Sequence, residues 1–84
     1  MKMSLEKVIP LLQQVANDRT VPRNIRTKIE ESIAVLQVSK DDLKIRVGTA
    51  IANLDEVAND PNIPMYTRTL IWNIVTALEA LRQQ

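Results

Sequence analysis

The 84-residue chain contains no cysteine, no histidine and no phenylalanine, and only one glycine, one tryptophan and one tyrosine. The missing cysteines exclude disulfide bonds and thiolate metal sites. The missing histidines remove the commonest metal ligand and the usual general base near neutral pH. A single glycine leaves little room for the tight turns that join β-strands. The composition therefore favours packed helices with an aliphatic core.

A dominant charge and a long apolar run are also missing. The chain has 11 basic and 10 acidic residues, a net charge of +1, so no strong field steers it toward nucleic acid or anionic lipid. No apolar run approaches the roughly 20 residues of a membrane span. Residues 1–7 lack the continuous apolar region of a secretory signal. We expect a soluble, cytoplasmic protein with no membrane association.

What the sequence does contain is a repeated unit. Residues 15–18 read Val-Ala-Asn-Asp, and residues 57–60 repeat the same four residues at an offset of 42. At this offset 12 of the 42 aligned pairs are identical. Repeats of this length are typical of stacked helical hairpins, which generally bind or scaffold other molecules. Further identical pairs include Pro22 with Pro64, Arg26 with Arg68, Thr27 with Thr69, Ile29 with Ile71 and Leu36 with Leu78.

Apolar residues recur at intervals of three and four, which predicts four helices. The first is expected over about residues 4–17, the second from about Pro22, the third after a capping signal at Ser39 and Asp42, and the fourth over about residues 64–81. Short connections make sequential helices antiparallel. The sequence thus predicts an all-α, four-helix up-and-down bundle. It forms a single domain over residues 1–84, built from two repeated αα-hairpins at about 1–42 and 43–84.

The repeated turn is the best-defined local motif. Asparagine tolerates the left-handed conformation that closes a helix, and the carboxylates of Asp18 and Asp60 can accept hydrogen bonds from the following amides. Arg26 and Arg68 lie one turn into the next helix, within reach of these aspartates or of the preceding helix's last carbonyls. We favour a structural capping role, and a ligand site present in duplicate is the alternative.

The two copies differ most in their second helices. Apolar or aromatic residues of the fourth helix stand where the second helix has polar or charged ones, which widens its apolar arc. Two explanations remain open: the fourth helix is the most buried helix of an asymmetric bundle, or it contacts another chain, either a second copy in a homo-oligomer or an unknown protein. Large aromatic residues dominate interface hot spots. The predicted interface residues are Met65, Tyr66, Leu70, Trp72 and Asn73.

A basic cluster at the start of the second helix provides a rival hypothesis, which is low-specificity RNA or DNA binding through phosphate contacts. Acidic residues intermingle with this cluster, and aromatic residues that could stack on bases are absent from it. We therefore rank this hypothesis below a protein interface. Its residues are Arg19, Arg23, Arg26 and Lys28.

No pattern of catalytic residues is present. The serines have no histidine to activate them, and no glycine-rich phosphate loop occurs. A carboxylate pair from Asp18 and Asp60 is conceivable, but a bundle of this size has little concave volume for a substrate. We predict that the protein is not an enzyme and has no catalytic residues, no cofactor and no metal site.

These motifs together resemble a known family. Residues 59–64, Asn-Asp-Pro-Asn-Ile-Pro, and residues 67–72, Thr-Arg-Thr-Leu-Ile-Trp, are similar to the signature of a family of small, uncharacterised archaeal proteins. Residues 17–26 match the first half of the same family, so that the motif VANDxxxPxxxRT is paired along the chain. The resemblance implies an all-α, four-helix up-and-down fold from archaeal cytoplasm. It implies no activity, and it transfers no functional residue.

Overall fold

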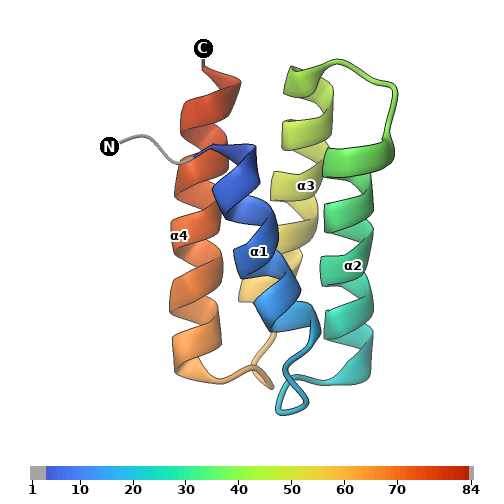
Figure 1. The fold of residues 1–84 in the computed structure, drawn as a ribbon. Helices are drawn as coiled ribbons and strands as arrows, with labels where there is room; N and C mark the ends of the chain where they lie inside the picture. The colour runs from blue at the N-terminus through green and yellow to red at the C-terminus, as the bar shows by residue number, and fades with distance from the viewer. Residues whose placement is uncertain (1–3, 84) are drawn as a thin grey trace.

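The computed structural model describes residues 4–83, which form four α-helices and no strand. The helices are α1 (Leu5–Ala16), α2 (Arg23–Val38), α3 (Leu43–Ala58) and α4 (Met65–Arg82). They run alternately up and down, as Figure 1 shows. Both α1 and α3 pack against α2 and α4, so each helix has two neighbours. The predicted all-α, four-helix bundle is confirmed. Residues 1–3 and 84 of the predicted domain lie outside the described residues.

The core is aliphatic throughout. All four helices contribute buried valine, isoleucine or leucine side chains, and α3 adds alanines. Val21 and Ile63, one in each repeated turn, are also buried, and the two turns lie together at the lower end of the bundle in Figure 1. Because these two residues lie in the turns and not in the helices, their burial fixes each turn directly to the core.

Both predicted proline starts are displaced by one residue. Pro22 and Pro64 were expected at the first helical position, but their ψ angles of 148° and 153° are extended, and the helices begin at the next residue. Each proline carbonyl accepts the first intrahelical hydrogen bonds, from Arg26 N at 3.0 Å and from Arg68 N at 3.1 Å. The fixed φ of proline suits this preceding position equally well.

The asparagines that end α1 and α3 do not adopt the predicted left-handed conformation. Asn17 and Asn59 have φ angles of −96° and −86°. The amides of Asp18 and Asp60 instead bond the carbonyl oxygens three residues earlier, each at 3.1 Å. This tighter last turn closes the helix without a positive φ.

The start of α3 also differs from its prediction. Asp42 is the N-cap, and its Oδ1 accepts a hydrogen bond from Ile45 N at 3.0 Å. Ser39 bonds the side chain and the amide of Asp41 instead. Of the two residues predicted to cap α3, only the second, Asp42, does so.

Within the described part of the chain, no helix is both long and apolar enough to cross a membrane.

Candidate functional site

None of the seven most exposed residues of α4 is charged, and its partly exposed Glu79 and Arg82 pair with each other at 2.8 Å near the end of the helix. Every other helix within residues 4–83 exposes at least two charged side chains, such as Glu6 and Lys7 on α1 or Lys44 and Asp55 on α3. We call this uncharged surface the α4 face. It consists of the seven exposed residues of the helix, Met65, Tyr66, Thr69, Trp72, Asn73, Thr76 and Ala80.

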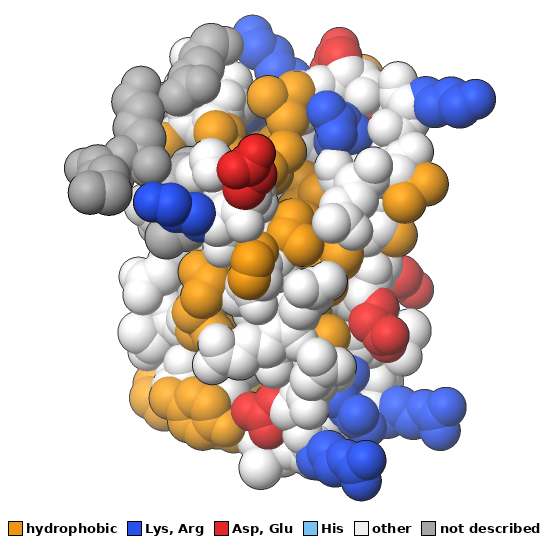
Figure 2. Space-filling view, viewed as in Figure 1, with side chains coloured by type: hydrophobic (Ala, Val, Ile, Leu, Met, Phe, Trp, Pro, Cys, Tyr) orange, Lys and Arg blue, Asp and Glu red, His pale blue; other side chains and the backbone are white. Residues whose placement is uncertain are grey.

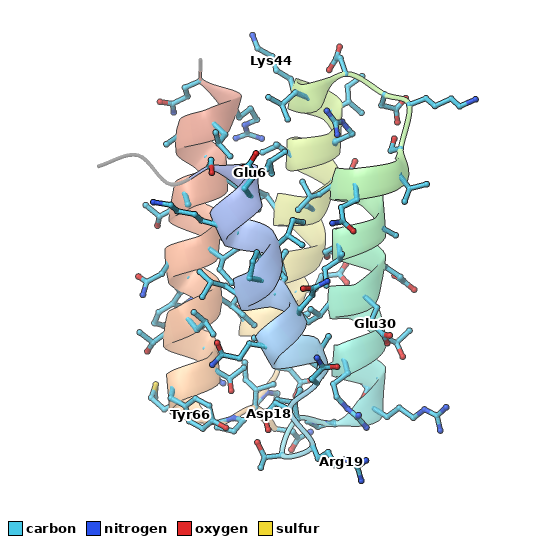
Figure 3. The ribbon with its side chains drawn as sticks, viewed as in Figure 1. Glu6, Asp18, Arg19, Glu30, Lys44 and Tyr66 are labelled. Atoms are coloured by element: carbon cyan, nitrogen blue, oxygen red, sulfur yellow. The ribbon has the colours of Figure 1, made fainter. Side chains whose placement is uncertain are left out.

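Three large side chains dominate the α4 face. Met65, Tyr66 and Trp72 expose 65%, 60% and 51% of their surfaces. At 100° per residue, Met65 and Trp72 project in almost the same direction, two turns apart. Figure 2 shows hydrophobic side chains gathered at the lower end of α4, the end at which Figure 3 labels Tyr66. The apolar surface is therefore concentrated in the first half of the helix.

The structure separates the predicted interface residues into two groups. Met65, Tyr66, Trp72 and Asn73 are exposed together on the α4 face. Leu70 is partly buried and packs against the chain's own core, so less of its side chain is exposed than in the other four. The prediction left Thr69 and Thr76 out of the interface, although the spacing from Met65 to Trp72 places them on the same line of the helix.

Tyr66 is held in place by the first repeated turn. Its hydroxyl donates a hydrogen bond to Asp18 Oδ2 at 2.7 Å and lies 3.1 Å from Thr20 Oγ1. Thr20 donates to Asp18 Oδ1 from its hydroxyl at 2.6 Å and from its amide at 2.9 Å. Figure 3 shows Tyr66 and Asp18 at the same end of the bundle. These hydrogen bonds restrict the Tyr66 side chain before any partner binds.

The same network explains the ionisation of Asp18. Its pKa is lowered first by the Thr20 hydroxyl, then by the hydrogen bonds from Tyr66 and from the Thr20 amide, and more weakly by the charge of Arg26. Each donor stabilises the charged carboxylate over its protonated form. Asp18 is therefore a charged acceptor that positions two hydroxyl groups.

The second repeated turn is closed differently. Asp60 Oδ1 accepts a hydrogen bond from Asn62 N at 2.8 Å, which matches the bond from Thr20 to Asp18. Arg68 adds bonds to Ala58 O at 2.9 Å and to Asp60 O at 2.8 Å. The equivalent Arg26 makes no such bond, and its buried Nε has no hydrogen-bond partner among the described residues. The turn groups thus bond one another, as capping requires.

The four residues of the basic cluster differ in exposure and in their contacts with carboxylates of the chain. Arg19 and Arg23 are exposed at the lower end of the bundle, where Figure 3 labels Arg19. Lys28 forms an ion pair with Glu56 of α3 at 2.7 Å, and the hydrogen bond and charge of Glu56 raise its pKa. Arg26 is half-buried beside Asp18. Two of the four positive charges therefore already face a carboxylate within the chain.

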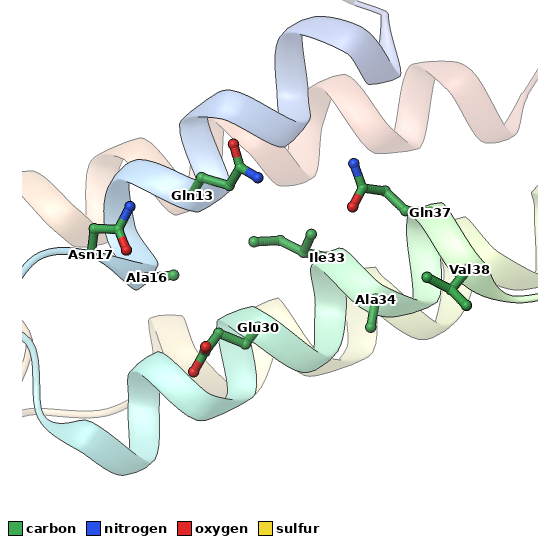
Figure 4. A pocket seen from close by; sticks show the side chains of 8 residues that line it. All are labelled: Gln13, Ala16, Asn17, Glu30, Ile33, Ala34, Gln37 and Val38. Atoms are coloured by element: carbon green, nitrogen blue, oxygen red, sulfur yellow. The ribbon is translucent and has the colours of Figure 1, made fainter.

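A shallow groove with both polar and apolar walls lies between α1 and α2. It has a volume of about 390 Å³, and Figure 4 shows the side chains that line it. Its walls hold three carboxamides but only one ionisable group, Glu30. The described residues contain no cluster of three or more acidic side chains that could hold a metal ion. The absence of enzymatic activity stays a prediction.

Fold and surface together define a small four-helix bundle with one uncharged, partly aromatic helix face. Residues 1–81 match the model of the uncharacterised protein family UPF0147, and the chain belongs to this family. A UPF0147 protein of Metallosphaera sedula is 45% identical over 78 residues, which cover 93% of this chain and 88% of that protein. One of Methanothermobacter thermautotrophicus is 42% identical over 80 residues, covering 95% and 78%.

A solved structure supports the same assignment. The crystal structure of a UPF0147 family protein from Thermoplasma acidophilum has a TM-score of 0.85 and 41% sequence identity, and the match covers 90% of this chain and 89% of that one. The predicted membership of a family of small archaeal, all-helical proteins is confirmed. These relatives are named by family alone, so a function has to be argued from the surface.

Proposed function

We propose that this protein is a non-catalytic association module that binds another protein through the α4 face. The observation that carries the proposal is a comparison of equivalent positions. All seven residues of the α4 face have exposed counterparts 42 residues earlier, on α2. Those counterparts are Arg23, Asn24, Thr27, Glu30, Glu31, Ala34 and Val38.

Burial within the bundle therefore does not account for the apolar character of α4. Trp72 and Glu30 are both exposed, and so are Met65 and Arg23. The exposed part of a large apolar side chain gains nothing for the fold of its own chain, and transferring that part to a protein surface is favourable. The loss of three charges at positions that stay exposed is what contact with a second polypeptide requires.

The composition of the α4 face fits a protein interface. Charged residues are depleted from interface cores, and Trp, Tyr and Met are enriched there. Trp72 has Met65 two turns before it and Thr76 one turn after it, with Thr69 between Met65 and Trp72, while Asn73 supplies a neutral polar border. The hydroxyl of Tyr66 is already bonded to Asp18, so less side-chain entropy is lost when a partner covers its ring.

Site-specific photo-crosslinking tests the proposal directly. A photoreactive phenylalanine analogue is placed at position 72 in one protein and at position 30 in another, because the two positions are equivalent in the repeat and both are exposed. Each protein is irradiated in an extract of its own organism. We expect a discrete protein adduct from position 72 and none from position 30. Equal adducts at both positions, or none at position 72, would contradict the proposal.

RNA or DNA binding is the second candidate, because Arg19 and Arg23 are exposed and form no salt bridge within the described residues. Such binding would be electrostatic and would weaken steeply with salt. A gel shift at low ionic strength separates the two functions. Binding that is lost in Arg23→Glu and kept in Trp72→Glu would favour nucleic acid over a protein partner.

A further inference from the structure

We infer that the partner covering the α4 face is a second copy of this chain, whose α4 packs antiparallel to the first. The inference rests on the proposed function and names its partner. It begins with the spacing of Met65, Thr69, Trp72 and Thr76, all of which are exposed. Intervals of four, three and four are those of the seam between two packed helices in a coiled coil. No helix of the same bundle covers this seam.

The seam alternates large and small side chains. Met65 and Trp72 are large, and Thr69 and Thr76 are small. When an identical helix lies antiparallel on this seam, Met65 faces the second copy's Thr76, and Trp72 faces its Thr69. Every layer then joins one large and one small residue, as close packing of facing positions requires. The α4 face is thus complementary in shape to itself turned end to end.

A parallel pair lacks this complementarity. It would set Trp72 against the second copy's Trp72 and leave the threonine layers underfilled. The next position of the seam is Glu79, which pairs with Arg82 of its own helix at 2.8 Å, and a parallel pair would also bring the two Glu79 carboxylates close to each other. In the antiparallel arrangement Glu79 lies beyond the four layers and meets no like charge within them. Packing and charge therefore favour the same orientation.

Symmetry also favours α4 over the other helices. In a twofold dimer, a charged residue near the axis lies beside its own copy and is repelled by it. The exposed sides of α1, α2 and α3 all carry charged residues, and only the α4 face has none among residues 4–83. A neutral face can pair with itself without such a penalty, whereas it offers nothing to select a charged partner.

The available area makes this a weak dimer. Aromatic side chains present about 150–250 Å² each. With Met65, Tyr66 and Trp72 more than half exposed and the threonines beside them, the face offers on the order of 600 Å² per copy. A pair then buries about 1,200 Å² in total, at the lower limit of specific, stable interfaces. We expect a reversible dimer that dissociates on dilution.

A matched pair of variants tests the inference. Thr69 and Thr27 are the same residue at equivalent exposed positions, so Thr69→Glu and Thr27→Glu differ only in the face that receives the charge. Sedimentation equilibrium is run from about 1 µM to about 1 mM, which spans weak to moderate association. We expect the wild-type mass to rise from 9.5 kDa toward twice that value. We expect Thr69→Glu to dissociate at least about 30-fold more readily, and Thr27→Glu to behave as wild type.

Circular dichroism of both variants confirms that each remains helical. A wild-type mass of one chain at every concentration, or equal weakening by both variants, would overturn the second copy as partner. The proposed function fails separately: an adduct from position 72 to a different protein would sustain it without a homodimer, and the absence of any adduct there would defeat both.

Orientation is tested with single cysteines, since the chain has none of its own. Met65→Cys and Thr76→Cys proteins are mixed in equal amounts and oxidised gently. Antiparallel pairing brings position 65 of one copy to position 76 of the other, so mixed disulfides should exceed the half expected from random pairing. An excess of 65–65 and 76–76 disulfides would overturn the antiparallel arrangement.

Discussion

The second helices of the two halves, α2 and α4, bury the same positions and expose different chemistry. Ile29 and Ile71 are both fully buried, and so is Leu78, while Leu36 is nearly so. The exposed positions coincide as well, yet Glu30 on α2 is replaced by Trp72 on α4. Two of the four buried pairs are identical, whereas only one of the seven exposed pairs is, because packing restricts buried residues more than exposed ones. The divergence on α4 therefore points to a role outside the fold.

The repeated turns differ in a second way. Arg68 closes its own turn through two hydrogen bonds to backbone carbonyls, and Arg26 makes neither of them. The first turn is instead joined to α4 by the bond from Tyr66 to Asp18. A residue of the second half, Tyr66, therefore bonds the turn of the first half, which within the described residues has no arginine closing it. This bond also places Tyr66 beside the rest of the α4 face.

The largest expected effect on stability concerns the buried isoleucines that α2 and α4 share. Ile29→Ala and Ile71→Ala should each lower the free energy of unfolding by about 2–5 kcal/mol, because each leaves a cavity in a core of small total stability. Urea unfolding at dilute concentration measures both. If one variant lost less than about 1 kcal/mol, the two helices would not be equivalent in the core.

The arginines of the two turns, Arg26 and Arg68, should contribute differently to the free energy of unfolding. Arg68→Ala removes two charge-assisted hydrogen bonds to Ala58 and Asp60 and should cost about 1–3 kcal/mol. Arg26→Ala removes a similar aliphatic stem without such bonds, and we expect a loss below about 1 kcal/mol. Thermal or urea unfolding of the two proteins gives the difference, and equal losses would show that the bonds of Arg68 contribute nothing to stability.

A buried hydroxyl distinguishes α4 from α2 at another equivalent position. Thr67 is buried and its Oγ1 has no hydrogen-bond partner among residues 4–83, whereas Ile25 occupies the same place in α2. Thr67→Val should raise the free energy of unfolding by about 1–2 kcal/mol.

Ser32→Ala is the control for this substitution, because the Ser32 hydroxyl does bond Lys28 O, at 3.0 Å. We expect little change or a loss of up to about 1 kcal/mol. A stabilisation by Ser32→Ala equal to that of Thr67→Val would indicate a general preference for apolar residues at both sites.

The smallest expected effect concerns the hydrogen bond between Tyr66 of the second half and Asp18 of the first. The pKa of Asp18 is lowered in the folded protein, so its carboxylate contributes stability above the unfolded pKa of about 3.9. That contribution is lost as the pH falls through the lower folded pKa. Tyr66→Phe should raise the folded pKa of Asp18, which carboxyl-carbon NMR titration measures. Trp72→Phe should leave it unchanged, and an equal rise in both variants would contradict the role given to Tyr66.

Local signals in the sequence predicted most of the fold. The intervals between apolar residues located all four helices, and the two prolines located the starts of α2 and α4 to within one residue. The errors lay at helix ends, where several short-range hydrogen-bond patterns satisfy the same backbone groups. Asp42 rather than Ser39 caps α3, and both asparagines keep negative φ angles.

The candidate site was harder to predict because it depends on contacts distant in sequence. Periodicity did not decide whether the bundle buries Trp72 or leaves it exposed, and it did not show that Leu70 would pack partly against the core. The bond between Tyr66 and Asp18 joins residues 48 positions apart, and no local pattern indicates it. The exposure of Trp72 and the hydrogen bond of Tyr66 depend on how the four helices pack, which the sequence pattern does not specify.

The most direct test uses the only tryptophan of the chain, since its fluorescence reports from the α4 face without a label. Acrylamide quenching of Trp72 is measured as the protein concentration rises through the dimerisation range. The account predicts that quenching falls and emission moves to shorter wavelength, and that Thr69→Glu keeps the dilute behaviour throughout. An indole that remains as open to acrylamide at the highest concentration as at the lowest would contradict a second copy on this face.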